Sequence, residues 1–133
     1  MNAESDEQQK IMQFQMLQNN LKVLEEKERM IMSALDELER TKMALEDLKN
    51  CKGDTYIPLG ASNFVLGKIE DNQNVLVSIG SGLAVKMPRE DAIKDIGEKT
   101  KELDTESKKI SLELQKVSNH LIKLQTEIEA LRQ

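Results

Sequence analysis

The chain has 133 residues, of which 32% are charged and 38% are hydrophobic, and its net charge is −5. Aromatic residues make up only 2%, which leaves little material for a globular core. Basic residues alternate with acidic ones, and phosphate binding needs a concentrated basic face, so nucleic acid is excluded as a main partner.

The sequence also predicts where the protein works. No apolar run approaches the roughly 18 residues that a membrane span needs. The first residues, Met1–Lys10, are polar and acidic, so they are not expected to be a secretory signal. Cys51 is the single cysteine, which excludes an internal disulfide, and an inert thiol near a helix end is favoured over a catalytic one. We therefore expect a cytoplasmic protein that does not bind membranes.

Residues 6–52 are predicted to form one long helix. Ser5 to Gln8 have the spacing of a capping box, and Gly53 offers a left-handed cap at the other end. At about 1.5 Å per residue this helix is on the order of 70 Å long. Its apolar residues follow the 3–4 spacing of a coiled coil. One heptad position holds Phe14, Leu21 and Leu35, and its partner position holds Leu17, Leu24, Ile31, Leu38 and Leu45.

Residues 53–87 form an island with no helical period. Four short β-like runs are expected, separated by a Gly-Ala-Ser turn, a polar turn cluster over 71–74 and a tight reversal at Gly80-Ser81-Gly82. The Gly80-x-Gly82 pair lacks the remaining residues of a phosphate loop, so a hairpin turn is favoured. The result is two β-hairpins whose open edges need partners. On physical grounds the island is an assembly element.

Residues 88–133 are predicted to form the second helix, beginning at Pro88 with acidic residues in its first turn. An even number of strands returns this helix alongside the first, so the two should pack antiparallel. The expected fold class is α+β, a long antiparallel coiled-coil hairpin with two β-hairpins at its base, in a single domain over 1–133. The heptad residues are Ile96, Leu103, Ile110, Val117, Leu124 and Leu131, interleaved with Leu114, Leu121 and Ile128.

Few residues offer any chemistry. His120 is the only histidine and has no metal-binding neighbours at helical spacing, so neither a metal nor a cofactor is predicted. No nucleophile and base occur in a catalytic arrangement, and an enzyme is not expected. Polar residues interrupt the apolar seam, which favours local control of register over a binding role. These polar seam residues are Glu28, Lys42, Thr100 and Ser107.

Several apolar residues lie off the seam, toward the end of the coiled coil farthest from the island. Methionine is flexible and suits a surface that accepts many apolar shapes. Good helix propensity or fraying of this end explains the same residues equally well, and the sequence leaves both interpretations open. The residues are Ile11, Met12, Met16, Val23 and Ile122.

The island carries a family resemblance. It reads Tyr-Ile-Pro-Leu-Gly-Ala from Tyr56, Phe-Val-Leu-Gly-Lys-Ile from Phe64 and Val-Leu-Val-Ser-Ile-Gly-Ser-Gly from Val75, followed by Asp-Ala-Ile from Asp91. With both helices in place, the chain resembles the alpha-type subunits of prefoldin, the hexameric chaperone of archaea and eukaryotes. Beta-type subunits have a shorter island with one hairpin, so four runs favour the alpha type.

The resemblance implies an ATP-independent holdase. Its hairpins would join those of beta-type subunits into β-barrels of a heterohexamer, and its coiled-coil tips would hold unfolded proteins and pass them to a group II chaperonin. The implied client-binding residues are Met12, Phe14, Met16, Leu17, Ile122 and Leu124. The implied assembly residues are Ile57, Phe64, Ile69, Val75, Val77, Ile79, Leu83 and Val85.

One departure and one alternative accompany the resemblance. Many relatives carry an aromatic pair after the Gly-x-Gly turn, where this chain has Leu83 and Ala84. The alternative function is a structural scaffold similar to the filament-forming gamma-type prefoldins, because open-ended pairing of identical surfaces generates fibres. Light scattering of the chain purified alone would distinguish the two functions.

Overall fold

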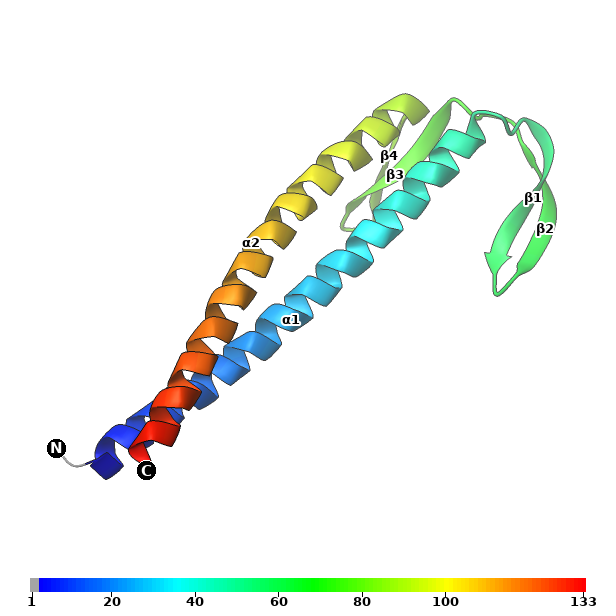
Figure 1. Cartoon of the computed structure of the whole chain (residues 1–133). Coiled ribbons are helices and arrows are strands. Elements are labelled where there is room, and N and C mark those ends of the chain that lie inside the picture. The colour runs from blue at the N-terminus through cyan, green and yellow to red at the C-terminus, as the bar shows by residue number, and fades with distance from the viewer. Residues whose placement is uncertain (1–2) are drawn as a thin grey trace. The chain divides into compact units, whose positions relative to one another are not determined.

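The computed structural model describes residues 3–133 and consists of two long helices separated by four strands (Figure 1). This arrangement confirms the predicted α+β class with two helices and two hairpins. Residues 1 and 2, which belong to the segment predicted not to be a secretory signal, lie outside the described residues. The elements in chain order are α1 (Ala3–Leu48), β1 (Gly53–Gly60), β2 (Asn63–Ile69), β3 (Asn74–Gly80), β4 (Leu83–Pro88) and α2 (Arg89–Leu131).

The chain divides into two compact units. The terminal unit joins Met1–Ala34 with Leu103–Gln133, and the hairpin unit comprises Leu35–Glu102. Each unit therefore contains part of both helices, and the four strands belong to the hairpin unit. The prediction of a single domain over 1–133 stays a prediction.

In the terminal unit, α1 and α2 lie side by side and run antiparallel, as predicted (Figure 1). Two ion pairs join the helices, Lys10 with Glu127 and Arg132 with Glu7. Between the helices lies the apolar seam, and each leucine or isoleucine buried there contributes about 1.5–3 kcal/mol. The buried residues of this unit all occupy predicted heptad positions: Leu24, Ile31, Ile110, Leu124 and Ile128.

The end of α1 differs from the prediction. The helix ends at Leu48 and tightens into turns in which the amides of Lys49, Asn50 and Cys51 each bond a carbonyl three residues earlier. Gly53 has the expected left-handed backbone, with φ of +84°, but it is the first residue of β1 and not the cap of the helix. The predicted cap at Gly53 was wrong because the helix ends in these turns, before the chain reaches Gly53.

The strands form two separate antiparallel hairpins, β1 with β2 and β3 with β4. Ile57 pairs with Val65 in the first, and Val77 pairs with Val85 in the second. The predicted reversal around Ser81 is confirmed as a hairpin turn, in which Gly80, Ser81 and Gly82 all have positive φ. The first hairpin turns instead through Ala61 and Ser62, with φ of 49° and 64°. A left-handed conformation at these non-glycine residues is strained by about 1 kcal/mol each.

Candidate functional site

The first hairpin exposes apolar side chains on both of its faces. One face presents Tyr56, Phe64 and Leu66, each at least 60% exposed, and two of these are direct cross-strand partners. The other face presents Ile57 and Val65. Ile57 lies over Gly67, where an added Cβ would be 2.5 Å from the Ile57 Cδ1 atom. Contiguous exposed apolar side chains are typical of interaction surfaces, and a two-stranded sheet is only marginally stable by itself.

The second hairpin is partly covered on one face. A groove with a volume of about 570 Å³ lies between β3, Met87 and the first turns of α2. Apolar side chains such as Val77 and Ile79 line one wall. The other wall is charged and carries Asp91, Lys94, Asp95, Glu98 and Lys99. The opposite face of the hairpin leaves Leu76 73% exposed, so this hairpin also has uncovered apolar surface.

The structure distributes the eight predicted assembly residues over both hairpins. Ile57, Phe64, Ile79, Leu83 and Val85 are exposed, whereas Ile69, Val75 and Val77 are half-buried. Sequence reasoning missed residues that are as exposed as any of these. The missed residues are Tyr56, Leu59, Leu66 and Leu76. Strand alternation would have found three of them. Leu66 lies two residues after Phe64 on the same face, and Tyr56 and Leu76 each lie on the face opposite a predicted neighbour in the same strand.

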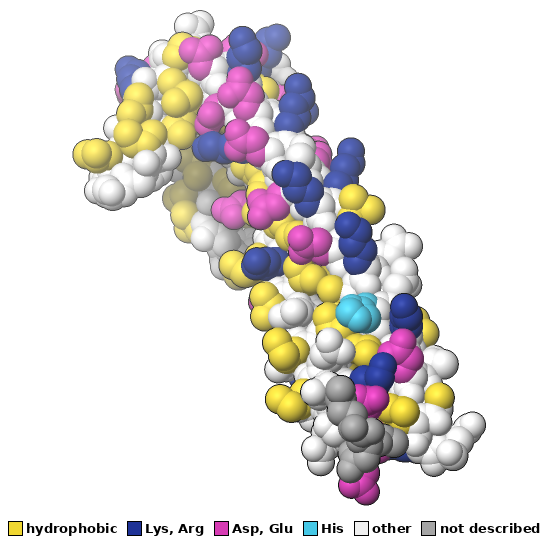
Figure 2. Space-filling view, turned by 90° about the vertical axis from the view of Figure 1, so that its left-hand side faces the viewer, with side chains coloured by type: hydrophobic (Ala, Val, Ile, Leu, Met, Phe, Trp, Pro, Cys, Tyr) yellow, Lys and Arg dark blue, Asp and Glu magenta, His cyan; other side chains and the backbone are white. Residues whose placement is uncertain are grey.

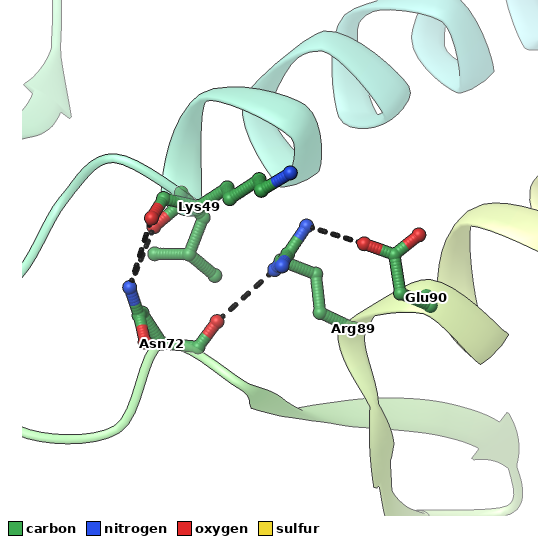
Figure 3. Close-up of polar contacts among 5 residues, drawn as sticks. Lys49, Asn72, Arg89 and Glu90 are labelled. Carbon is green, nitrogen blue, oxygen red and sulfur yellow. Dashed lines mark hydrogen bonds and ion pairs between the residues drawn. The ribbon is translucent and has the colours of Figure 1, made fainter.

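A polar junction joins the strands to both helices within the hairpin unit. The Asn72 side chain donates to the carbonyls of Leu48 at 3.4 Å and Lys49 at 3.1 Å, which satisfies the end of α1 (Figure 3). The Arg89 Nε donates to the carbonyl of Asn72 at 3.1 Å, and its Nη1 donates to Glu90 at 2.9 Å. Both helix ends are thereby tied to the single loop between the hairpins.

The same loop holds an ordered carboxylate. Asp71 accepts hydrogen bonds from the backbone amides of Gln73 and Asn74 and from the Asn74 side chain. The amide of Gln73 makes the largest contribution, followed by the Asn74 side chain, in lowering the pKa of Asp71 below its ordinary value. In the terminal unit, the hydrogen bond from Lys10 lowers the pKa of Glu127 in the same way. Both carboxylates are stabilised in their charged form.

The terminal unit exposes a second apolar surface. Of the predicted client-binding residues, Met12, Met16 and Ile122 are 63–64% exposed, and Phe14 and Leu17 are half-buried. Leu124 is only 3% exposed, so its side chain packs in the seam. Val23, one of the predicted off-seam residues, is exposed, and so is Met30, which the prediction did not include; the two follow Met16 at intervals of seven residues. That interval is the signal that could have found Met30.

The remaining candidate residues are Cys51 and His120. Within residues 3–133, no group of three His, Cys, Asp or Glu side chains is placed to hold a metal ion. Cys51 is half-buried and has its Sγ atom 3.5 Å from the carbonyl of Asp47. His120 is exposed, and both hydrophobic and charged side chains lie around it on the face shown in Figure 2. None of the helices in the described part of the chain has the length and apolar character needed to cross a membrane.

Sequence comparisons agree with this geometry. A family model described as prefoldin subunit matches residues 13–133. Prefoldin subunit alpha 1 of Thermococcus kodakarensis is 35% identical over 92 residues, which cover 68% of this chain and 63% of that protein. Prefoldin subunit alpha of Pyrococcus horikoshii is 33% identical over 95 residues, which cover 69% and 64% of the two chains. The match thus spans less than two thirds of the length of these two relatives.

A solved structure has the same fold. A chain from the cryo-EM structure of filamentous PFD from Methanocaldococcus jannaschii superposes with a TM-score of 0.70 and covers 90% of this chain and 98% of that chain. The two sequences are only 19% identical, so this likeness concerns the fold alone.

Proposed function

The chain belongs to the prefoldin family, and we propose that it is an alpha-type subunit of a chaperone that holds unfolded proteins without ATP. The observation that carries the proposal is the exposure of three large apolar side chains of the terminal unit, Met12, Met16 and Ile122. These side chains stand on a pair of helices and not in an enclosed pocket. Such a surface suits weak contacts with many unfolded chains, and several subunits acting together add these contacts into useful avidity.

Assembly is the second part of the proposal. We propose that the hairpins pair with those of beta-type prefoldin subunits into the β-barrels of a heterohexamer. Two observations support this: each two-stranded sheet has open edges, and apolar residues such as Tyr56 and Leu76 are exposed on the strands. Pairing with other subunits would satisfy the edges and cover these side chains. In this proposal the clients pass to a group II chaperonin in the cytoplasm, and the subunit has no enzymatic role.

The holding function can be tested by aggregation of a chemically unfolded protein. The chain, assembled with a beta-type partner, should suppress light scattering in the absence of ATP. Replacing Met12, Met16 and Ile122 by serine should reduce the suppression. A matched control replaces Met32, Met43 and Leu112, which are 55–60% exposed elsewhere on the same helices. Equal loss in both triple variants would contradict the assignment of the client surface.

A filament-forming scaffold is the second candidate function. It is favoured by the fold shared with a chain from a filamentous prefoldin and by the open edges of both hairpins, which permit pairing without closure. The mass of the purified chain separates the candidates. Long polymers formed by this chain alone support the scaffold, whereas a closed complex that forms only with a beta-type partner supports the chaperone subunit.

A further inference from the structure

The terminal unit contains a stretch that is nearly free of charge. Charged residues make up 32% of the chain, yet residues 11–21 contain none. Residues 117–126 contain only Lys123 and the weakly basic His120. We call these two segments together the neutral collar. Its exposed polar residues are mostly amides, and they include Gln13, Gln18, Asn19, Asn20, Asn119 and Gln125.

The two segments of the collar lie next to each other. At one edge, the Lys10 Nζ atom is 2.6 Å from Glu127 Oε2, which sets residue 11 beside residue 126. At the other edge, Asn20 and Val23 of α1 line the same groove as Lys116 and Val117 of α2. Because both helices rise by about 1.5 Å per residue, the residues between these points face one another in antiparallel order. The collar is therefore one continuous surface with charged residues at both edges.

Apolar and amide side chains are interleaved on this surface. Met12, Met16 and Gln13 line one groove on α1. Gln13 precedes Met16 by three residues and Asn20 follows it by four, so both amides lie on the same helical face as Met16. An amide side chain both donates and accepts hydrogen bonds, and methionine adapts its shape to apolar partners. Together they match the two components of any unfolded chain, its peptide groups and its apolar side chains.

Helix stability does not account for this composition. Asparagine, present twice in succession at Asn19 and Asn20, is a poorer helix former than the glutamate and lysine used elsewhere in α1. A segment without charges also forgoes the ion pairs between residues four apart that support exposed helices. Exposed methionines also lower the solubility of the protein. The collar thus departs from what a coiled coil alone would favour.

We propose that the neutral collar binds extended, unfolded polypeptide through methionine contacts and amide-to-peptide hydrogen bonds, and that it accepts clients of either net charge with similar strength. This inference rests on the proposed holding function. At about 0.15 M salt, where charges act over about 8 Å, a surface with one lysine neither attracts nor repels a client strongly by charge. The peptide groups that the amides bond are present in every unfolded chain.

The test uses the chain assembled with a beta-type partner and two chemically unfolded proteins, one strongly acidic and one strongly basic. Binding is measured at about 0.01 M and about 0.15 M salt, where charges act over about 30 Å and about 8 Å. At about 0.15 M salt we expect less than about a twofold difference in Kd between the clients, which is under about 0.4 kcal/mol; at about 0.01 M the difference should grow, because the charges at the edges of the collar then act on the client.

Charge variants locate the effect. The double variant Gln13→Lys with Asn20→Lys should favour the acidic over the basic client by about three- to tenfold at low salt, because each added surface charge contributes up to about 1 kcal/mol. Gln13→Glu with Asn20→Glu should reverse this preference. The control, Ser33→Lys with Ser111→Lys, adds the same charges at exposed positions of the same unit outside the collar and should change neither Kd by more than about twofold.

Each outcome separates this inference from the proposed function. Wild-type binding at about 0.15 M salt that depends strongly on client charge overturns the neutral collar while leaving the holding function intact, and this comparison needs no variant. If the charge variants at Gln13 and Asn20 change Kd no more than the control Ser33→Lys with Ser111→Lys, clients bind elsewhere, and the neutral collar is also overturned. If the wild-type complex binds neither client at either salt, both the holding function and the collar fail.

Discussion

Leu124 and Ile122 are two residues apart on α2 and differ sharply in exposure, 3% against 63%. Leu124→Ala removes three buried carbon atoms, each contributing about 0.8 kcal/mol, so we expect a loss of about 2–3 kcal/mol in the free energy of unfolding. The cavity term is small, because a seam between only two helices can close around the gap. Ile122→Ala removes little buried surface and gains helix propensity, so its effect should stay within about 0.5 kcal/mol.

The assay for this pair is urea unfolding followed by circular dichroism, with both variants at the same subunit concentration because assembly shifts apparent stability. Client binding is measured in parallel. Ile122→Ala should weaken binding by about fivefold, or about 1 kcal/mol, without loss of stability. The main effect of Leu124→Ala should be a lower free energy of unfolding. Equal unfolding free energies for the two variants would refute the assignment of Leu124 to the seam and Ile122 to the surface.

Three further predictions concern the hairpin unit and the carboxylates. Asn72→Ala should lower the free energy of unfolding by about 1 kcal/mol, because it removes the hydrogen bonds that the Asn72 side chain donates to the carbonyls of Leu48 and Lys49; urea unfolding that matches wild type would contradict this role. Ala61→Asn with Ser62→Gly should stabilise the protein by about 0.5–1 kcal/mol, because both replacements tolerate positive φ; thermal unfolding should show a higher Tm, and a lower Tm would count against strain at this turn. The lowered pKa values of Asp71 and Glu127 stabilise the fold at every pH above their unfolded values near 4. This stability should be lost as pH falls below about 4 through the lowered folded values, and in acid titration Asp71→Asn and Glu127→Gln should each flatten the decline.

Much of the fold could be predicted because its signals are local and repeated. The 3–4 spacing identifies both helices and the seam, since only a helix of that period places residues such as Leu24 and Ile31 on one side. Turn residues around Ser81 identify the second hairpin. The bonds from the Asn72 side chain to the carbonyls of Leu48 and Lys49 could not be predicted, because Asn72 lies 24 residues beyond Leu48. No local pattern contains that contact.

The candidate surfaces were only partly predictable, for a related reason. Heptad position separates Leu124 on the seam from Ile122 beside it, so their exposures follow from the sequence. Which face of each hairpin stays uncovered depends on the register that the turns impose and on packing against α2. Val77 is half-buried beside the charged start of α2, while Leu76, its neighbour, is exposed. Apolar residues on both faces of a strand do not reveal this difference.

The two exposed apolar surfaces, on the hairpins and on the collar, differ in whether the elements beneath them need a partner chain to be stable. A two-stranded sheet is at best marginally stable in water, so the exposed side chains of the hairpins, such as Tyr56 and Leu76, need another chain for their strands to persist. The collar needs no partner, because its helices complete their own backbone hydrogen bonds and pack along the seam around Leu124 and Ile128. The exposed methionines of the collar therefore remain available for binding after assembly, whereas the exposed apolar side chains of the hairpins would be covered by it. The helices complete their own backbone hydrogen bonds and the open strand edges do not. For this reason we propose assembly on the strands and transient binding on the helices.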